Sequence, residues 1–274
     1  MREKAVIVVQ ARMSSTRLPG KVMMPILGKS LLVRMIERLQ MVRHEVTIVI
    51  ATTVSNEDDI IVLEAEMLGI PFYRGSINNL VDRHYKAAKI HGADLVLKIP
   101  SDCPLIDPQV IDEVLDHYFA NREKFDYVSN LHPATWPDGN DVEVMTIECL
   151  EKAWQHAAQG MQQEHTTPYI WENAGKFRIG NVSWSSGLDY SMSHRFTIDY
   201  ADDYEFIKRV FEELYPAKKN FSCDDILELL VRKPEIYQLN AHYAGVNWYR
   251  NHLDELKTVS AGQTKQAPGE LTTA

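Results

Sequence analysis

Three cationic side chains lie close together near the start of the chain. Arg12, Arg17 and Lys21 follow an apolar run at residues 6–9, and the residues between them include two serines, a threonine, a proline and a glycine. Arginine offers phosphate a fork of N–H donors, lysine a mobile point charge, and small residues let backbone N–H groups approach closely. The pattern predicts a buried strand followed by a loop that binds a polyphosphate or another small anion.

Two aspartates, Asp102 and Asp199, stand where strands are predicted to end. Magnesium prefers oxygen ligands and usually takes one or two carboxylates, together with water and substrate phosphates. Two aspartates brought together by the fold would therefore suffice for a Mg²⁺ site. Each could instead cap the helix or turn that follows it, and the spacing leaves both interpretations open.

A third group of polar side chains lies in the middle of the chain. Asp141 and Glu143 alternate with apolar residues on a predicted strand, so they share one face and could hydrogen-bond a polyhydroxylated ligand. The commoner alternative is that this face meets solvent. Glu164 and His165 follow later, where the histidine is either functional or structural. Trp136, in a loop with proline and glycine, could serve as a ligand platform.

The charge of the chain is unevenly distributed. Its 274 residues carry a net charge of −9, whereas residues 1–43 contain nine Lys or Arg and two acidic residues. A basic opening on an acidic body indicates a small anionic ligand and argues against a nucleic-acid surface. Arg34, Arg38 and Arg43 are predicted to form only the solvated face of a helix.

The remaining composition excludes several classes of protein. Hydrophobic residues make up 45% and charged residues 24%, as in ordinary globular proteins. We expect a cytoplasmic protein, because no apolar run reaches membrane-spanning length and no signal-peptide core follows the N-terminus. The three cysteines, Cys103, Cys149 and Cys223, lack paired spacing, so we expect free thiols and no thiolate zinc site.

The first half of the chain alternates between strand and helix patterns. Strands are predicted at residues 6–9, 46–51, 72–73, 94–99 and 127–129, and helices at 30–43, 56–68, 79–91 and 108–121. This rhythm is typical of an α/β fold with a parallel sheet. Since ligands of such sheets bind beyond the carboxyl ends of strands, the loops after residues 9, 73 and 99 are expected to share one crevice.

The second half is less regular. Strands are predicted at 141–147, 177–182 and 196–198, and helices at 148–158, 163–173, 204–214, 223–231 and 246–256. We expect one domain over residues 1–259, with a small inserted lobe at about 131–195, and a flexible tail at 260–274.

With these motifs in view, the sequence resembles the sugar-acid cytidylyltransferases, which include CMP-KDO synthetases and acylneuraminate cytidylyltransferases. Within that family it is most similar to the spore coat polysaccharide biosynthesis protein F group. The resemblance covers roughly residues 1–215. It rests on five motifs in the family's order: residues 10–22, residues 72–76 with Asp82-Arg83, and residues 102–108, 164–169 and 195–199.

The resemblance implies a Rossmann-like three-layer sandwich of the nucleotide-diphospho-sugar transferase type. It also implies that Arg12, Lys21 and Asp102 are catalytic and that Mg²⁺ is held by Asp102 and Asp199. The nucleotide-binding residues that it implies are Ala11, Arg12, Ser15, Arg17, Lys21, Arg74 and Asp82. The sugar is expected at Asp141, Glu143, Glu164 and His165, where acceptor sites differ across the family.

The implied activity is the transfer of CMP from CTP to a sugar or sugar acid, with release of pyrophosphate, in surface polysaccharide biosynthesis. The resemblance also implies a homodimer. Ser14 and Ser101 stand where family members commonly carry glycine, and a serine there would be strained if the backbone took a positive φ. An alternative is therefore a non-catalytic nucleotide- or glycan-binding protein on the same fold. A glycosyltransferase on a similar fold would be expected to carry an Asp-x-Asp motif, which residues 101–103 do not form.

Overall fold

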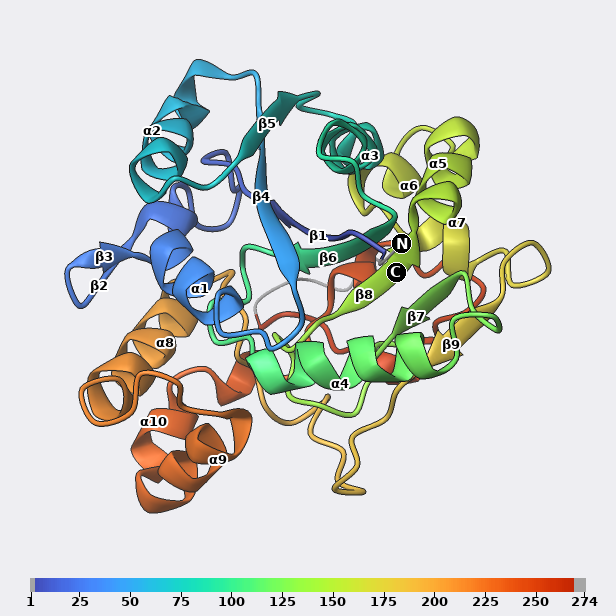
Figure 1. Ribbon diagram of the computed structural model, residues 1–274. Helices are drawn as coiled ribbons and strands as arrows, with labels where there is room; N and C mark the ends of the chain where they lie inside the picture. Colours follow the sequence, from blue (N-terminus) through green and yellow to red (C-terminus); the bar gives the residue numbers. More distant parts are fainter. Residues whose placement is uncertain (1–2, 269–274) are drawn as a thin grey trace.

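A seven-stranded sheet forms the centre of the computed structural model, which describes residues 3–268 (Figure 1). Its order is β5-β4-β1-β6-β8-β7-β9, and β8 alone runs antiparallel to its neighbours. The strands are β1 (Ala5–Gln10), β4 (Val46–Thr53), β5 (Phe72–Gly75), β6 (Leu95–Pro100), β7 (Tyr127–Ser129), β8 (Glu143–Thr146) and β9 (Ile179–Asn181). A separate hairpin joins β2 (Pro25–Ile26) to β3 (Lys29–Ser30).

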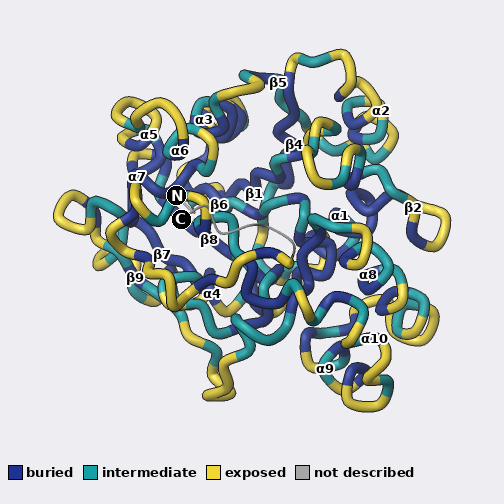
Figure 2. Tube along the Cα trace, turned by 180° about the vertical axis from the view of Figure 1, so that it is seen from behind, coloured by how far each residue is buried: buried dark blue, intermediate teal, exposed yellow. Residues whose placement is uncertain are grey.

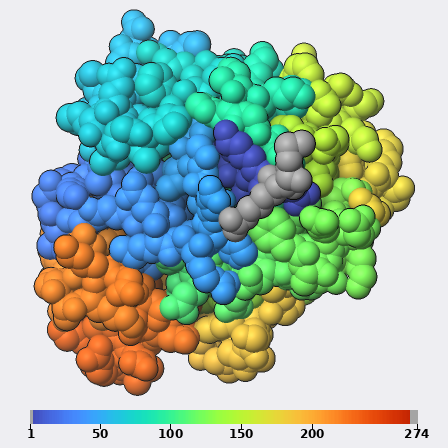
Figure 3. Space-filling view, in the orientation of Figure 1, coloured from blue at the N-terminus to red at the C-terminus, as the bar shows by residue number. Residues whose placement is uncertain are grey.

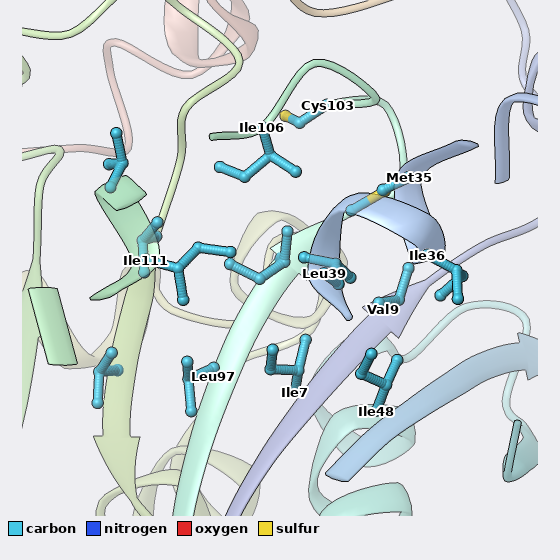
Figure 4. Packing of buried hydrophobic residues seen from close by; sticks show 14 of the residues in the cluster. Ile7, Val9, Met35, Ile36, Leu39, Ile48, Leu97, Cys103, Ile106 and Ile111 are labelled. Carbon is cyan, nitrogen blue, oxygen red and sulfur yellow. The ribbon is translucent and has the colours of Figure 1, made fainter. Parts of the chain in front are cut away.

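Helices cover both faces of this sheet. One face packs on α1 (Leu31–Leu39), α2 (Asp59–Leu68) and α4 (Pro108–Ala120), and the other on α3 (Leu80–Ile90), α5 (Ile147–His156) and α7 (Pro168–Trp171). Figure 4 shows Ile7, Val9 and Leu97 facing Met35 and Leu39 of α1. Figure 2 shows the strands as the buried centre of the molecule. The predicted α/β three-layer sandwich is confirmed.

A second, smaller core packs helices from residues 201–238 against the start of the chain. It contains α8 (Ala201–Leu214), α9 (Cys223–Arg232) and α10 (Pro234–Gln238), whose apolar side chains pack with those of Ile26 and Leu31. In Figure 3 this orange block lies against the blue N-terminal third. Short 3₁₀ turns lie at Lys21–Met23, Asn56–Asp58, Ala241–Tyr243, Trp248–Asn251 and Ala261–Gln263.

This second core overturns the interpretation of two arginines on α1. Arg34 and Arg38 are only 4% and 1% exposed, whereas Arg43 lies at the surface. Arg38 donates from Nε to the Ile106 carbonyl at 2.7 Å and from Nη2 to the Phe221 carbonyl at 2.9 Å. Burial lowers its pKa to about 10. The prediction of a solvated face was therefore wrong for Arg34 and Arg38, because carbonyls of the β2–β3 hairpin cover Arg34 and carbonyls of later loops cover Arg38.

Three predicted elements of the second half also differ. The helix predicted at 163–173 is two short helices, α6 (Met161–Glu164) and α7, because Thr166 has a φ of 67° between them. Residues 196–198 form no strand, and the nearest ladder contact is a single bridge between Asp138 and Arg195. The helix predicted at 246–256 is reduced to one 3₁₀ turn.

The structure also bears on the predictions for the inserted lobe, the tail, the three cysteines and the two serines. Residues 131–195, the predicted lobe, contribute β8 and β9 to the central sheet. Of the predicted tail, residues 260–268 are described and 269–274 lie outside the described residues. Cys103, Cys149 and Cys223 are free and buried, as predicted. Within residues 3–268, the non-glycine residues with positive φ are Leu27 and Thr166, so neither Ser14 nor Ser101 carries that strain.

No helix among residues 3–268 is both long enough and apolar enough to cross a membrane.

Candidate functional site

A cavity of about 840 Å³ opens at the carboxyl ends of β1 and β6. The start of the antiparallel β8 lies at the same edge of the sheet, so its first residue reaches the cavity as well. The residues that line the cavity come from seven stretches, which lie within residues 10–22, 77–83, 98–103, 130–143, 164–171, 189–199 and 246–263. The predicted crevice therefore forms. No residue of β5 itself lines it, but residues that follow β5 do.

The loop after β1 is folded back on itself. The Met13 carbonyl accepts hydrogen bonds from the N–H groups of Ser15 and Gly20, both at 2.9 Å, and the Met13 N–H donates to Asp58 at 2.7 Å. Gly20 has a φ of 72°, which glycine adopts without the penalty that a Cβ brings. The 3₁₀ turn that follows directs Lys21 inward.

Lys21 binds the two aspartates that the sequence placed at strand ends. Its Nζ lies 3.2 Å from Asp102 Oδ2 and 2.9 Å from Asp199 Oδ1, and donates to the Ile198 carbonyl at 2.6 Å. Asp102 and Asp199 meet because the Asp102 carbonyl accepts from the Ile198 N–H at 2.8 Å. Burial alone would lower the pKa of Lys21, but the two carboxylates outweigh it and the pKa is raised.

Asp199 is surrounded by positive charge. Besides Lys21, it pairs with Arg17 Nη2 at 2.6 Å and with Arg195 Nη2 at 2.9 Å. Burial raises the pKa of Asp199, but these three cations outweigh it and bring the pKa to about 2. Asp199 is therefore ionised throughout the physiological range.

Arg12 differs from these cations. It lines the cavity and is exposed, and within the described residues it makes no hydrogen bond or ion pair. Its charge contributes to lowering the pKa of the neighbouring Arg83 and His165, after burial, which is the largest cause in both. Arg12 is thus available to an anionic ligand. A bound anion would also offset the positive charge of Arg12 and its cationic neighbours.

Glu143 and Asp141 both face the cavity, so the solvent-face alternative does not hold for them. Glu143 is 2% exposed; it pairs with Lys98 and accepts from the Tyr127 hydroxyl at 2.6 Å. Burial raises the pKa of Glu143, but Lys98 and its hydrogen bonds lower it overall. Asp141 has weaker support, because its carboxylate accepts from the Gly139 N–H at 3.3 Å, and burial raises its pKa to about 6.

Glu164 and His165 line the cavity beside them. The His165 ring stacks on Trp248 with 3.7 Å between ring centroids. Burial, followed by the charge of Lys98, lowers the pKa of His165 to about 3, so the imidazole is neutral near pH 7. Trp136 also lines the cavity but is 3% exposed and packs against Trp184, which leaves little ring surface for a ligand.

Two predicted nucleotide-binding residues do not line the cavity. Arg74 donates to the carbonyls of Thr53 and Ser55 at 2.9 and 2.7 Å and pairs with Asp59. Asp82 accepts from Trp154 Nε1 at 2.8 Å.

Arg83, the next residue on α3, does line the cavity. It is buried, donates from Nη1 to the Ser76 carbonyl at 2.8 Å and has no partner for its Nε in the described structure. Neighbouring helix positions point in different directions, so the motif Asp82-Arg83 brings one of its two side chains to the cavity.

The sequence reasoning missed Arg195 as a site residue. Its guanidinium donates to Asp138 at 3.0 Å, to Asp199 at 2.9 Å and to the fully buried Asp203 at 2.9 Å. These carboxylates raise the pKa of Arg195 despite its burial. The available signal was the spacing of Arg195, Asp199 and Asp203 at four-residue intervals. Lys98 and the residues after 245 were missed as well.

The donor chemistry of the site fits a divalent cation. No cluster of three or more His, Cys, Asp or Glu side chains in the described part of the chain could hold a metal ion by itself. Asp102 and Asp199 nevertheless converge on one positive charge, the Lys21 ammonium, and Mg²⁺ needs no more than two carboxylates when a phosphate completes its ligands.

Comparisons with known proteins show the family of the chain. A family model described as Cytidylyltransferase matches residues 6–248. An uncharacterised protein of Methanocaldococcus jannaschii is 32% identical over 87% of this chain and 95% of its own length. The spore coat polysaccharide biosynthesis protein SpsF of Bacillus subtilis is 28% identical over 83% of this chain and 94% of its own length.

Solved structures give the same result. A cytidylyltransferase from Leptospira borgpetersenii superposes with a TM-score of 0.81 and 34% identity, over 86% of this chain and 98% of that one. A CMP:2-keto-3-deoxy-manno-octonic acid synthetase solved with CTP shares the fold, with a TM-score of 0.57 and 17% identity, over 77% of this chain and 100% of that one. The chain belongs to the cytidylyltransferase family.

Proposed function

We propose that this cytidylyltransferase joins CMP from CTP to a sugar or sugar acid, releases pyrophosphate and requires Mg²⁺. The observation that carries the proposal is that the loop after β1 offers two different groups. Its Arg12 has no partner among residues 3–268, and its Lys21 faces two carboxylates. A triphosphate would pair with Arg12, and a divalent cation would be held by the two carboxylates.

In this mechanism Arg12 and Lys21 bind the phosphate oxygens of CTP. A sugar hydroxyl attacks the α-phosphorus in line with the departing pyrophosphate, and the two cations neutralise the charge that builds on the oxygens. Asp102 and Asp199 would hold Mg²⁺, which supplies further neutralisation of that charge when bound. With those carboxylates on Mg²⁺, the Lys21 ammonium would be available to the phosphate oxygens.

The acceptor belongs at the end of the cavity formed by Asp141, Glu143, Glu164 and His165. Glu143 is held in place by Lys98 and Tyr127, so it can accept hydrogen bonds from sugar hydroxyls without reorganising. The names of two relatives support this class of acceptor: the B. subtilis spore coat protein, and a 3-deoxy-manno-octulosonate cytidylyltransferase of Chloroherpeton thalassium, 35% identical over 43% of this chain and 47% of its own length. We place the reaction in surface polysaccharide biosynthesis, in the cytoplasm where CTP is made. The homodimer stays a prediction.

The experiment is a screen of CTP, UTP, ATP and GTP against several sugar acids and neutral sugars, with and without Mg²⁺, read by pyrophosphate release. The expected result is release that requires CTP, Mg²⁺ and an acceptor together. Tight CTP binding with no release under any acceptor would instead support the non-catalytic alternative. Release that occurs equally without an acceptor would indicate hydrolysis and contradict the transfer.

A further inference from the structure

The C-terminal wall, defined here as residues 244–268, closes one side of the cavity. Asn247, Trp248, Tyr249, Gly262 and Gln263 all line it. The family model ends at residue 248, so most of this wall follows the part of the chain that the family defines. Figure 1 shows this segment in red, close to α7. The cavity therefore contains a surface that the nucleotide-binding loop does not supply, and of these five residues Tyr249, Gly262 and Gln263 lie beyond the family match.

Internal hydrogen bonds give the wall a fixed shape. The Gly245 carbonyl accepts from the Lys265 N–H at 2.7 Å, and Thr264 Oγ1 accepts from the Asn247 N–H at 3.1 Å. Gly245 has a φ of 83°, and a Cβ there would lie 2.9 Å from Met192 Cε, so the turn requires glycine.

The wall is also attached to the rest of the molecule. Arg195 Nη1 donates to the Val246 carbonyl at 3.2 Å, and Glu172 accepts from the N–H groups of Lys257 and Thr258, both at 2.9 Å. Leu256 and Val259 are buried in the core that includes α5 and α7. Its position beside the cavity is therefore fixed at its start and in its middle.

Two aromatic rings of the wall face the predicted acceptor end. Trp248 stacks on His165, whose pKa responds to the charges of Lys98 and Glu143. The Tyr249 hydroxyl donates to the Gln263 carbonyl and accepts from Asn247 Nδ2, both at 2.8 Å, which fixes its ring.

Tyr249 lines the same cavity as two carboxylates, Asp138 and Asp141. Burial, followed by the charges of Asp138 and Asp141, raises its pKa to about 12, so its hydroxyl stays neutral. Flat rings next to carboxylates suit a sugar, which presents C–H groups on one face and hydroxyls at its edge. The cationic loop that suits the triphosphate belongs to residues 12–21, which the wall does not include.

We propose that the C-terminal wall is the acceptor-recognition element, with the rings of Trp248 and Tyr249 stacking on the acceptor sugar. This inference rests on the proposed transfer of CMP to a sugar, and it assigns the choice of acceptor to residues outside the phosphate loop. Replacing the wall's rings changes acceptor affinity and preference while leaving the CTP site intact.

The test compares Trp248→Ala and Tyr249→Ala with the ring-retaining variants Trp248→Phe and Tyr249→Phe, using pyrophosphate release with each substrate varied in turn. Loss of a stacking contact is expected to raise the KM for the acceptor about tenfold. The KM for CTP should stay within about twofold of the wild type, and the phenylalanine variants should stay close to it in both. Trp154→Ala, which removes a tryptophan that does not line the cavity, is the matched control.

Two results would overturn the proposal: an unchanged acceptor KM in both alanine variants, or a rise in the KM for CTP as large as that for the acceptor. If the wild type releases no pyrophosphate with any acceptor, the proposed function fails, and the wall is tested separately by tryptophan fluorescence. With CMP present, 3-deoxy-manno-octulosonate and N-acetylneuraminate should change the fluorescence of the wild type, and the change should be smaller in Trp248→Phe, where Trp136 and Trp171 still line the cavity. No change in the wild type would reject the wall as a sugar site.

Discussion

Lys21 connects the two halves of the site at the scale of single residues. It comes from the first loop, whereas its partners Asp102 and Asp199 come from positions 81 and 178 residues later. Its ammonium is buried, yet Asp199 keeps two other cations, Arg17 and Arg195, when Lys21 is removed. Lys21 is therefore more important for the charge that develops during the reaction than for folding.

Lys21→Ala should lower kcat about 10²- to 10³-fold, the usual effect of removing one group that stabilises transition-state charge. The melting temperature should fall only by a few degrees. Lys29→Ala is the matched control, because Lys29 lies outside the cavity and pairs with Glu37 at the surface. Steady-state pyrophosphate release and thermal unfolding measure the two quantities. Turnover equal to that of the Lys29 control would refute the assignment of Lys21.

Asp141 makes the stability depend on pH. Its pKa is raised to about 6 by burial in the folded protein, against about 3.9 when unfolded. Between these values the folded state keeps a proton that the unfolded state has lost, so the free energy of unfolding falls as the pH rises from 4 to 6 and stays lower above it. Asp141→Asn should therefore be about 3 kcal/mol more stable than the wild type at pH 8 and nearly equal at pH 4. Urea unfolding at both pH values measures this, and a variant less stable at pH 8 would show that the ionised carboxylate is stabilised by its contacts.

The residues of the candidate site were predictable where sequence patterns reflect chemistry. A loop with three cations between small residues is unusual enough to indicate an anion site, and Arg12, Arg17 and Lys21 all line the cavity. Whether a side chain points inward depends on its place in the element, since successive side chains are turned by about 100° in a helix and about 180° in a strand. That is why Arg83 lines the cavity while Asp82 and Arg74 do not.

At the scale of elements, the β2–β3 hairpin carries an unfavourable turn residue. Leu27 and Gly28 have φ values of 49° and 78°, the conformation of a type I′ turn, which favours Asn-Gly. Leu27 is 43% exposed, so its side chain contributes little packing. Leu27→Asn should raise the free energy of unfolding by about 0.5–1 kcal/mol.

The matched control for this hairpin is Gly28→Ala, which adds a Cβ at a positive φ in open space and should destabilise the protein by about 1 kcal/mol. Both changes are measured by urea unfolding. A Leu27→Asn variant that is no more stable than the wild type would show that the leucine side chain contributes packing that its exposure does not reveal.

The helices that were predicted well have both their caps and their apolar stripe in the local sequence. α1 is capped by Ser30, whose hydroxyl accepts from the Val33 N–H, and its buried face includes Leu32, Met35 and Leu39. What covers the opposite face is not local: Arg34 and Arg38 are buried by carbonyls from other segments, the farthest at residue 221. The helix predicted at 246–256 failed because that segment is held by contacts to Arg195 and Gln263.

At the scale of the whole molecule, Arg195 joins parts of the chain that the sheet does not connect. It reaches Asp138 in the loop before β8, Asp199 at the cavity, Asp203 on α8 and the carbonyl of Val246 in the C-terminal wall. This set of contacts around Arg195 could not be predicted from sequence, because each partner of Arg195 has an equally good local role as a cap or turn residue.

Removing these contacts should destabilise the whole fold. Arg195→Met leaves Asp203, which is fully buried, without its main counter-charge, and breaking a buried pair in this way costs about 3–5 kcal/mol. Arg209→Met is the matched control on α8, since Arg209 is exposed and pairs with Glu205 at the surface, where a pair contributes about 0.5 kcal/mol. Because part of the cost is the orphaned charge, the double variant Arg195→Met/Asp203→Asn should recover part of the stability lost in the single one. Urea unfolding of the four proteins measures these differences. A loss of unfolding free energy below about 1 kcal/mol in Arg195→Met would mean that Asn240, which also donates to Asp203, is sufficient to hold that carboxylate.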